Sequence, residues 1–411
     1  MEQVLNKLKE YNQEHLLMFF NELTQEKKEE ILKQIANIDF EQIKNIVNDK
    51  CEKQKEMDII EPITSVQNAN FTESELSEFS NIGREIISSS KYAIITMAGG
   101  QGTRLGHTGP KGTYKLSFKD KDRYIFEIFV DKLKAVYDAY GVYLPWYIMT
   151  SRSNNDETIS FFENNNYFGY PKDKIKFFAQ GELPITDMEG NVVLESQEKV
   201  FMAADGNGGI FNALVKNNII AELKETGIEW VLITGVDNIL ANMADETYIG
   251  LVKSQNKLNG VKSIVKSCPE EKVGVFCRRN KRPSVIEYTE MTDVMRHATD
   301  NNGNYLYADA NIVNHLLNIQ MLERIGNNKL PIHKAIKRLD YIDKNGEYIR
   351  PNEPSVIKYE TFIFDYFSMV DDTTVYRVER DKEFAPIKNK EGVDSPVTAI
   401  KLYENFYFKE G

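Results

Sequence analysis

The sequence predicts an α/β fold for most of this chain, with a mixed, mainly parallel sheet and helices on both faces. Short apolar runs typical of buried strands alternate with segments of helical spacing from about residue 90 onward. A glycine-rich loop follows the first run, Ala93–Met97, and a carboxylate, Asp237, follows a later run that begins at Trp230. Open α/β sheets bind ligands at the carboxyl ends of their strands, so both features fall where a site is expected.

The composition is that of an acidic globular protein. The chain has 411 residues, 41% apolar and 27% charged, which is enough for a sizeable core in two or three domains. Its net charge of −11 argues against a nucleic-acid or anionic-membrane surface, because both need a broad basic face. The N-terminus lacks the apolar core of a signal peptide, and no stretch reaches the length of a membrane span. Cys51, Cys268 and Cys277 lack metal-type spacing, which predicts a reduced, cytoplasmic protein.

Residues 1–80 are predicted to form a helical cap or arm that packs on a main domain, 81–411. Thr24 and Asp39 are plausible N-caps, and Thr72 with Glu75 forms the pattern of a capping box. Nothing in this region indicates chemistry.

From residue 92 onward the predicted elements follow one another closely. Strands are expected at Ala93–Met97, Trp146–Thr150 and Ile175–Ala179, with helices at 124–140 and 155–165 between them. The sequence Glu189-Gly190-Asn191 then indicates a hairpin between Thr186 and Leu194.

The loop after the first strand combines glycines with cations. Glycine can take φ > 0 and let a ligand lie against backbone N–H groups, and Arg104 and Lys111 add positive charge. The dinucleotide fingerprint fails because Leu105 occupies its third glycine position, and no P-loop is present. A plain strand-to-helix turn with surface cations is the alternative, but the nearby Arg and Pro-Lys favour phosphate binding. The glycines of this loop are Gly99, Gly100, Gly102 and Gly106.

Two later features extend the predicted site. Ala204–Gly209 precede a predicted helix over 210–226 and hold more glycine than an N-cap needs, which favours a close approach of backbone to a ligand. Asp237 follows an apolar strand, where an Asp most often caps the next turn. Beside two loops suited to phosphate, however, it is predicted to hold Mg²⁺, which takes one or two carboxylates together with phosphate oxygens.

Three charged residues further along have weaker signals. Glu287 lies in one of two predicted antiparallel strands within Val273–Tyr288, and it either faces a polar ligand or points to solvent. Lys358 precedes Tyr359–Phe367, predicted to be an aromatic-rich helix, and Lys388 lies near the C-terminus. Each lysine alone is typical of a surface charge. The five histidines form no Ser-His-Asp arrangement, so nucleophilic hydrolysis is not supported.

Nine motifs occur in one order between about residues 70 and 395: AGGQGTRLG with PKG, WYIMTS, FFAQGELP, ADGNGG, VDN, VGVFC, IEYTE, IKYETFIFD and EFAPIKN. Together they resemble the UDP-N-acetylhexosamine pyrophosphorylases, part of the wider UDP-sugar pyrophosphorylase family. The glycine loop is closer to this branch than to the UDP-glucose enzymes. The resemblance implies a Rossmann-like nucleotidyltransferase (GT-A-like) fold. It also implies reversible uridylyl transfer, in which UTP and a sugar 1-phosphate give a UDP-sugar and pyrophosphate.

The resemblance assigns roles to individual residues. It implies that the catalytic cations are Arg104, Lys111 and Lys388. It implies UTP contacts for Ala98, Gly99, Gly100, Lys111, Gln180, Gly206, Asp237 and Lys358. Sugar contacts are implied for Asn207, Gly274, Glu287, Asn311, Phe362, Phe364 and Lys388. Asp237 would hold Mg²⁺, and no general base is required because the attacking phosphate is already ionised.

The chain departs from the family pattern in two places. Ala308-Asp309-Ala310-Asn311 replaces the usual Asn-Ala-Gly-Asn, which adds a carboxylate and leaves the choice of sugar open. The sequence stops at Gly411, whereas longer members continue, so the family's C-terminal β domain is expected to be largely absent.

The favoured function is a UTP:sugar-1-phosphate uridylyltransferase that forms UDP-N-acetylglucosamine. Synthesis of UDP-glucose or UDP-N-acetylgalactosamine is the alternative within enzymes, and a non-catalytic UDP-sugar-binding protein is the alternative from another class. A glycosyltransferase would not need the triphosphate loop of Arg104 and Lys111. The expected partners are UTP and a hexosamine 1-phosphate, with neither nucleic acid nor membrane, and the sequence leaves the oligomeric state open.

Overall fold

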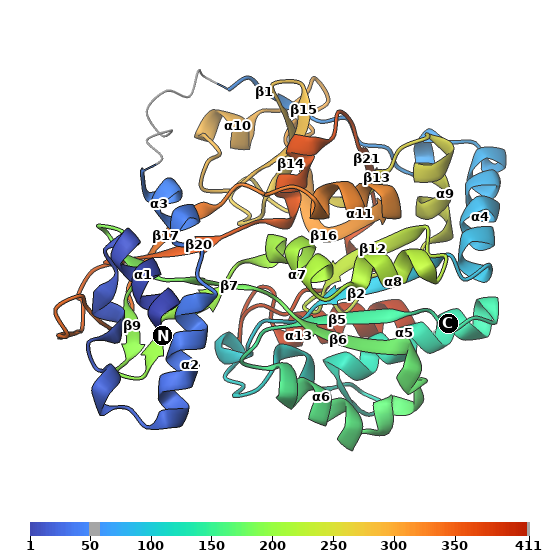
Figure 1. Cartoon of the computed structure of the whole chain (residues 1–411). Helices are drawn as coiled ribbons and strands as arrows, with labels where there is room; N and C mark the ends of the chain where they lie inside the picture. Colours follow the sequence, from blue (N-terminus) through green and yellow to red (C-terminus); the bar gives the residue numbers. More distant parts are fainter. Residues whose placement is uncertain (49–57, 409–411) are drawn as a thin grey trace. The chain divides into compact units, whose positions relative to one another are not determined.

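The structure is a computed structural model that describes residues 1–48 and 58–408 (Figure 1). These residues form two compact units, each assembled from separate stretches of the chain. Within the described ranges, the small unit comprises Met1–Met57, Gly181–Gly209 and Leu330–Asp365, and the large unit comprises Asp58–Gln180, Ile210–Lys329 and Tyr366–Gly411. The predicted domain boundary at residue 80 stays a prediction.

A ten-stranded mixed sheet forms the centre of the large unit. Its strands are β1 (Ile60–Pro62), β2 (Tyr92–Met97), β5 (Trp146–Thr150), β6 (Ile175–Ala179), β12 (Trp230–Gly235), β13 (Asn259–Val265), β14 (Val275–Arg279), β15 (Arg282–Ile286), β16 (Asp309–Asn318) and β21 (Thr374–Arg377). The central strands β12, β2, β5 and β6 run parallel to one another, and β16 pairs with β12 antiparallel. This confirms the predicted mixed α/β sheet and its parallel centre.

Helices cover both faces of this sheet. Successive residues of a strand point to opposite faces, so the neighbours Trp146 and Tyr147 contact different helices. On one face Trp146 stacks on Phe129 of α5 (Ile125–Tyr140), with ring centroids 6.2 Å apart. On the other face Tyr147 donates a hydrogen bond of 3.1 Å to Glu222 of α8 (Ile219–Glu225). The other helices of the large unit are α4 (Glu73–Ser88), α6 (Asn155–Asn164), α7 (Ile210–Lys216), α9 (Glu246–Ser254), α10 (Asp293–His297), α11 (Ile319–Gly326), α12 (Arg380–Glu383) and α13 (Pro396–Tyr407).

Helix α4 begins at the predicted capping box. Glu75 N donates to Thr72 Oγ1 at 3.2 Å, and Thr72 N donates to Glu75 Oε2 at 2.7 Å. The helix packs closely on α9, since a Cβ at Gly83 would lie 1.9 Å from the Glu246 carbonyl oxygen. The predicted helix over 210–226, in contrast, is two helices, α7 and α8. The chain breaks between them at Asn218, which takes a left-handed φ of 59°.

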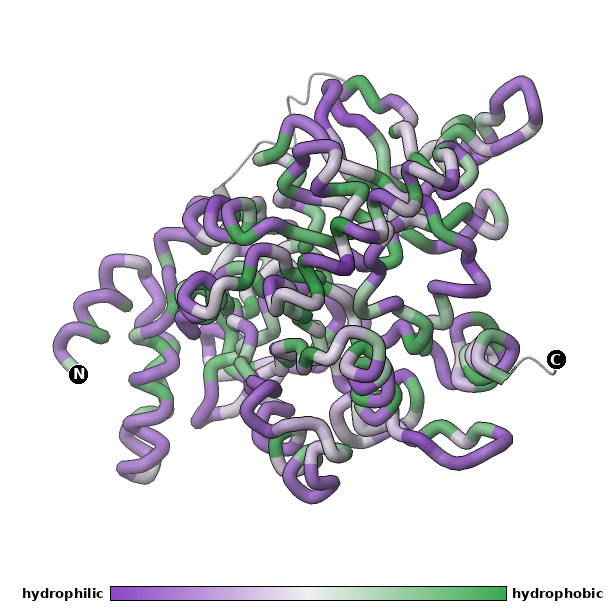
Figure 2. The backbone as a smooth tube through the Cα atoms, turned by 90° about the vertical axis from the view of Figure 1, so that its right-hand side faces the viewer, coloured by the Kyte–Doolittle hydropathy of each residue, from purple (hydrophilic) through white to green (hydrophobic). Residues whose placement is uncertain are grey.

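The small unit combines the N-terminal helices with short strands. Its helices are α1 (Glu2–Tyr11), α2 (Gln25–Ala36) and α3 (Phe40–Asn48). Its strands are β7 (Glu182–Pro184), β8 (Thr186–Asp187), β9 (Leu194–Ser196), β10 (Lys199–Val200), β11 (Met202–Ala204), β17 (His333–Lys337), β18 (Tyr341–Ile342), β19 (Tyr348–Ile349) and β20 (Val356–Glu360). Green hydrophobic residues alternate with purple hydrophilic ones along the helices near the N-terminus (Figure 2). Their buried stripe, which includes Leu8 and Ile35, packs on Leu194.

The predicted helix over Tyr359–Phe367 is wrong. Lys358 and Tyr359 lie in β20, which pairs with β17 and β8, and a 3₁₀ helix follows at Ile363–Met369. Tyr359 is 1% exposed, and its hydroxyl hydrogen bonds to Thr186 Oγ1 at 2.8 Å. Aromatic and β-branched residues suit a half-buried strand well, so a short apolar run does not distinguish the two structures.

The structure bears on two sequence expectations, the lack of a membrane span and the reduced state of the cysteines. No helix among the described residues combines the length and apolar character that crossing a bilayer requires. Cys268 is exposed and Cys277 is buried, both as free thiols, whereas Cys51 lies outside the described residues.

Lys132 is a buried cation of the large unit. It lies on α5, and its Nζ donates a 2.7 Å hydrogen bond to the carbonyl oxygen of Ala241. Burial lowers the pKa of Lys132 to about 7, and the negative charge of Glu383 acts against this shift.

The large unit should gain stability as the pH rises above 7. The unfolded chain holds the Lys132 proton up to about pH 10.5 and the folded chain releases it near pH 7, so in this window the unfolded state binds more protons. We expect the free energy of unfolding of the wild type, relative to Lys132→Met, to rise by up to about 1.4 kcal/mol per pH unit between pH 7 and pH 9. Urea titrations at several pH values measure this difference. A difference that does not change with pH would mean that the buried lysine keeps its proton.

Candidate active site

The glycine loop after β2 is closed by its own backbone. Lys111 N donates to the Gly100 carbonyl oxygen and Gly102 N to the Gly109 carbonyl oxygen, both at 3.0 Å. These bonds hold the main chains of Gly100 and Lys111 together. Arg104 is exposed and Lys111 is half-buried. Neither cation has an ion-pair partner among the described residues, so both are available to an external anion.

The start of this loop lies beside Gln180. Ala98 is fully buried, and its N–H donates to the Met149 carbonyl oxygen at 2.7 Å, which joins the ends of β2 and β5. A Cβ at Gly99 would lie 3.0 Å from Gln180 Oε1, so the side chain of Gln180 lies directly against the glycine. A side chain at this position would require the end of the Gln180 side chain to shift. The structure thus brings three residues predicted to contact UTP, Ala98, Gly99 and Gln180, to one place.

Asn154 is a residue of this loop that sequence reasoning missed. It is fully buried, and its Nδ2 donates to the carbonyl oxygens of Gly99 (3.2 Å) and Ala98 (3.4 Å). Its Oδ1 accepts the Ser151 N–H at 2.8 Å. Asn154 follows the WYIMTS motif closely, but a single Asn in a predicted loop gives no signal of this role.

Asp237 and Lys388 lie next to each other at the carboxyl end of β12. The backbone N–H of Ile387 donates to the Asp237 carbonyl oxygen at 2.9 Å, which fixes Lys388 one residue away from this contact. Lys388 Nζ is 3.6 Å from Asp394 Oδ2, a distance too long for a hydrogen bond. The same segment reaches the glycine loop, since a Cβ at Gly106 would lie 4.0 Å from the Lys390 side chain.

The carboxylate of Asp237 suits a metal shared with a substrate. It folds back over Gly235, whose Cβ would lie 2.7 Å from Asp237 Oδ1, and it accepts no hydrogen bond within the described part of the chain. Within those same ranges, no three His, Cys, Asp or Glu residues are grouped to hold a metal by themselves. A lone carboxylate at the carboxyl edge of the sheet fits Mg²⁺, which completes its shell with water and phosphate oxygens rather than a full set of protein ligands.

Gly274, Glu287 and Asn311 form a second cluster of the large unit, between β14, β15 and β16. Asn311 N donates to the Gly274 carbonyl oxygen at 2.8 Å, and a Cβ at Gly274 would lie 3.0 Å from Glu287 Oε1. Asn311 Oδ1 accepts the N–H of Val313, which has a positive φ of 55°. Asn311 pairs with Ser263 of β13, and the register shifts between this pair and Val261–His315, so a bulge in β16 directly follows Asn311.

The additional carboxylate of the Ala308–Asn311 segment is bound within the protein. Asp309 is 2% exposed, and its Oδ1 accepts bonds from Ser263 Oγ (2.7 Å) and Arg377 Nε (2.9 Å). Arg377 Nη2 adds a second bond to Oδ2 at 2.7 Å, which makes a bidentate pair. Asp309 therefore serves as an internal anchor for β16 and does not present its charge to a ligand.

The remaining predicted residues belong to the small unit. Asn207 Oδ1 accepts the Ile363 N–H at 2.9 Å, and the rings of Phe362 and Phe364 stack with centroids 5.2 Å apart. Gly206 has a φ of 87°, and a Cβ there would lie 2.3 Å from the Thr361 carbonyl oxygen. Packing on Thr361 and Phe362 thus requires glycine at Gly206 and Gly208, and ligand contact there stays a prediction.

Lys358 has a partner within the small unit. Its Nζ donates to Glu360 Oε1 at 2.6 Å, and both side chains are about one quarter exposed (25% and 24%). Contact with a phosphate would require this lysine to leave Glu360 or to share its charge between the two anions.

Comparisons with known proteins agree with this geometry. The sequence profile of the UTP–glucose-1-phosphate uridylyltransferase family matches residues 19–399. A probable UDP-N-acetylglucosamine pyrophosphorylase of Dictyostelium discoideum is 34% identical, with 99% of this chain and 88% of that protein covered. The UDP-N-acetylglucosamine pyrophosphorylase of Saccharomyces cerevisiae is 35% identical, with 83% and 74% covered.

Solved structures give the same result. A putative UDP-N-acetylglucosamine pyrophosphorylase from Entamoeba histolytica has a TM-score of 0.76 and 32% identity, with 84% of this chain and 88% of that chain covered. The uridine diphosphate N-acetylglucosamine pyrophosphorylase from Trypanosoma brucei has a TM-score of 0.83 and 27% identity, with 98% and 84% covered. The chain belongs to the UTP–glucose-1-phosphate uridylyltransferase family, which confirms the predicted resemblance.

Asn154→Ala should loosen the glycine loop. The change leaves the buried carbonyl oxygens of Ala98 and Gly99 without their side-chain donor, so we expect the free energy of unfolding to fall by about 1–3 kcal/mol. Urea unfolding measures this loss. Asn164→Ala, at an exposed position of the same region, is the control and should change stability by less than about 0.5 kcal/mol. Equal effects of the two variants would remove Asn154 from its proposed structural role.

Proposed function

We propose that this protein is a uridylyltransferase that forms UDP-N-acetylglucosamine and pyrophosphate from UTP and N-acetylglucosamine 1-phosphate. The observation that carries the proposal is the meeting of the glycine loop, Asp237 and the Lys388 segment at one edge of the parallel sheet. Family membership and the names of the relatives support the reaction and the sugar. A cytoplasmic location, in keeping with the cysteine content, is part of the same proposal.

The reaction needs positioning and charge neutralisation rather than a base. A phosphate oxygen of the sugar 1-phosphate attacks the α-phosphorus of UTP, a new phosphorus–oxygen bond forms, and the bond to the bridging oxygen of pyrophosphate breaks. Arg104 and Lys111 are assigned to the triphosphate, where they offset the charge of the departing pyrophosphate. Lys388 is assigned to the sugar phosphate that becomes bonded to the α-phosphorus.

Asp237 is proposed to hold Mg²⁺. When bound, Mg²⁺ would neutralise phosphate oxygens and so ease the approach of two anions. Asp237 would supply the protein carboxylate, and the bond from the Ile387 N–H to its carbonyl oxygen places it beside the Lys388 segment.

The ends of the two substrates are assigned to the flanking clusters. The main chain of Ala98, Gly99 and Gly100, together with the side chain of Gln180, would bind the uridine part of UTP. Gly274, Glu287 and Asn311 would contact the sugar, with Asn311 directly before the bulge of β16. The residues of the small unit are assigned by the family resemblance: Gly206 and Lys358 to UTP, and Asn207, Phe362 and Phe364 to the sugar.

A panel of sugar 1-phosphates tests the reaction and its substrate. We expect pyrophosphate release from UTP and Mg²⁺ with the highest kcat/KM for N-acetylglucosamine 1-phosphate. A higher value for N-acetylgalactosamine or glucose 1-phosphate would move the assignment to that sugar. No release with any of them, combined with binding of a UDP-sugar by calorimetry, would favour a non-catalytic binding protein.

Asp237→Asn tests the metal assignment. Removing the charge should lower kcat by about 10²–10³-fold, the effect seen when a preorganised charge stabiliser is lost. It should also weaken Mn²⁺ binding in the presence of UTP, which paramagnetic relaxation of water measures without turnover. Asp173→Asn, an exposed carboxylate of the same unit, is the control and should change neither value. Wild-type activity in Asp237→Asn would remove this residue from the metal site.

A further inference from the structure

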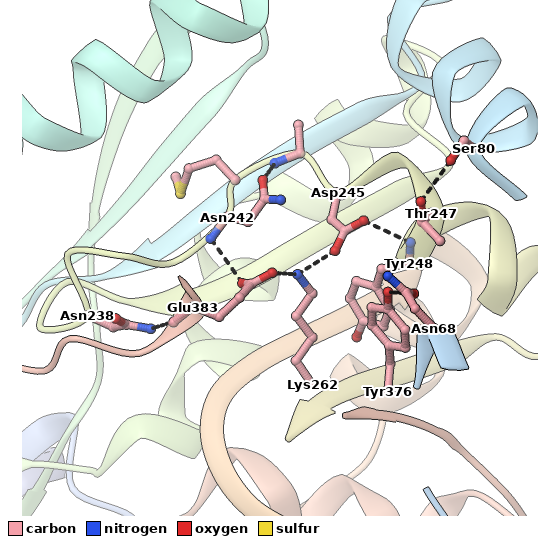
Figure 3. Close-up of polar contacts among 12 residues, drawn as sticks. Asn68, Ser80, Asn238, Asn242, Asp245, Thr247, Tyr248, Lys262, Tyr376 and Glu383 are labelled. Atoms are coloured by element: carbon pink, nitrogen blue, oxygen red, sulfur yellow. Dashed lines mark hydrogen bonds and ion pairs between the residues drawn. The ribbon is translucent and has the colours of Figure 1, made fainter. Parts of the chain in front are cut away.

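A buried ionic network lies near the loop that follows Asp237 (Figure 3). Lys262 on β13 is fully buried, and its Nζ is 2.6 Å from both Asp245 Oδ2 and Glu383 Oε1. The two carboxylate side chains are 15% and 11% exposed. One lysine therefore joins two acidic residues from distant parts of the chain, and we call this group the Lys262 triad.

Stability alone does not account for the Lys262 triad. Removing three charges from water costs several kcal/mol per ion, and replacing such a network by apolar residues of similar volume is often neutral or stabilising. Burial by itself would lower the pKa of Lys262, but Asp245 and Glu383 outweigh it and the pKa is raised, whereas burial raises the pKa of Glu383 although the charge of Lys262 acts against this shift. We therefore look for a role of the Lys262 triad in the segments that its two carboxylates contact.

Glu383 connects the triad to the loop of Asp237. Its Oε2 accepts the backbone N–H of Asn242 at 3.4 Å, and its carbonyl oxygen accepts Asn238 Nδ2 at 2.7 Å. Asn238 Oδ1 in turn accepts the N–H of Ala385 at 2.9 Å. The side chain and the main chain of Glu383 therefore both bind the residues that directly follow Asp237.

Asp245 fixes the far end of the same loop. Its Oδ1 accepts the Tyr248 N–H at 3.0 Å and so caps α9, while its Oδ2 binds Lys262. Lys262 lies on β13, which pairs with β16 and β21, so both partners are anchored to the sheet. Asp237 lies at the start of this loop, directly before Asn238, and its own carboxylate has no partner in the described part of the chain.

We propose that the Lys262 triad positions Asp237 and Lys388 relative to each other in the reaction proposed above. Lys388 Nζ is 3.6 Å from Asp394 Oδ2, and the Lys388 N–H donates to the Asp394 carbonyl oxygen at 2.7 Å, so Lys388 is placed by this turn together with the preceding main chain from Glu383 to Ile387. That main chain is attached to the Asp237 loop through the contacts of Glu383 and Asn238. A misplacement of about 1 Å can cost 10²-fold in rate, so a rigid internal tie between the two groups has a direct kinetic effect. Lys262, Asp245 and Glu383 act as positioning residues, since the proposed reaction places none of them against substrate.

The test is a triple variant that removes the charges without leaving one unpaired: Lys262→Met, Asp245→Asn and Glu383→Leu. Asn at position 245 keeps a side-chain acceptor for the α9 cap. We expect a folded protein whose kcat is lower by about 10- to 100-fold while KM for UTP changes by less than about threefold. Hydrogen exchange of the Ala385 and Ile387 amides should speed up by about tenfold or more, with the amides of β2 and β12 unchanged.

Two further variants make the test decisive. Glu383→Gln keeps an acceptor for Asn242 and should fall between wild type and the triple variant in kcat and in exchange at Ile387. Arg123→Met breaks a separate ion pair of the large unit, with Asp120, and should leave exchange at Ala385 and Ile387 unchanged.

The outcomes separate this inference from the proposed function. A folded triple variant with wild-type kcat and wild-type exchange at Ile387 would overturn the positioning role. If the triple variant does not fold, Glu383→Gln decides in its place: faster exchange at Ile387 supports the tie, and unchanged exchange overturns it. If the wild type releases no pyrophosphate with any sugar 1-phosphate, the proposed function fails, and hydrogen exchange still reports whether the triad holds the two segments together.

Discussion

The parallel, in-register pairing of β2 with β12 is the constraint on which the candidate site depends. Gly235 lies opposite Met97, so the two strands end at the same level and their following loops begin side by side. Because the strands are parallel, both loops leave from the carboxyl edge, where the glycine loop contributes N–H groups and cations and Asp237 contributes a carboxylate. A shift of this register by one residue would turn Asp237 away and separate the charges that the proposed reaction needs.

The cations of this acidic chain differ in how strongly they are already engaged. Arg104 and Lys111 have no ion-pair partner among the described residues, whereas Lys358 holds Glu360 at 2.6 Å and Lys388 stands 3.6 Å from Asp394. A free cation binds phosphate without breaking an existing pair, so the glycine loop is suited to the first contact with a triphosphate. Lys358 and Lys388 each have a carboxylate neighbour, so a phosphate would have to compete with that carboxylate for the lysine.

The features predicted correctly from sequence are those that a short window contains. The apolar run Ala93–Met97, the Thr72–Glu75 capping box and the glycine loop each depend on neighbours a few residues away. The errors arose where a local pattern fits two structures, as in Tyr359–Phe367, or where one left-handed residue, Asn218, ends a helix. Pairs far apart in the chain gave no signal: Arg377 lies 68 residues from Asp309, and Glu383 lies 121 from Lys262.

The departure at Ala308–Asn311 shows how such a distant partner changes the meaning of a motif. Taken alone, the additional carboxylate of Asp309 suggests an altered sugar pocket. In the fold, Arg377 binds it through two nitrogens and Ser263 through its hydroxyl, which satisfies the buried charge. The groups left beside Gly274 are then Asn311 and the carboxylate of Glu287. Asp309 therefore anchors β16 through Arg377 and Ser263 and adds no free carboxylate beside Gly274 that would oppose the proposed preference for an N-acetylated sugar.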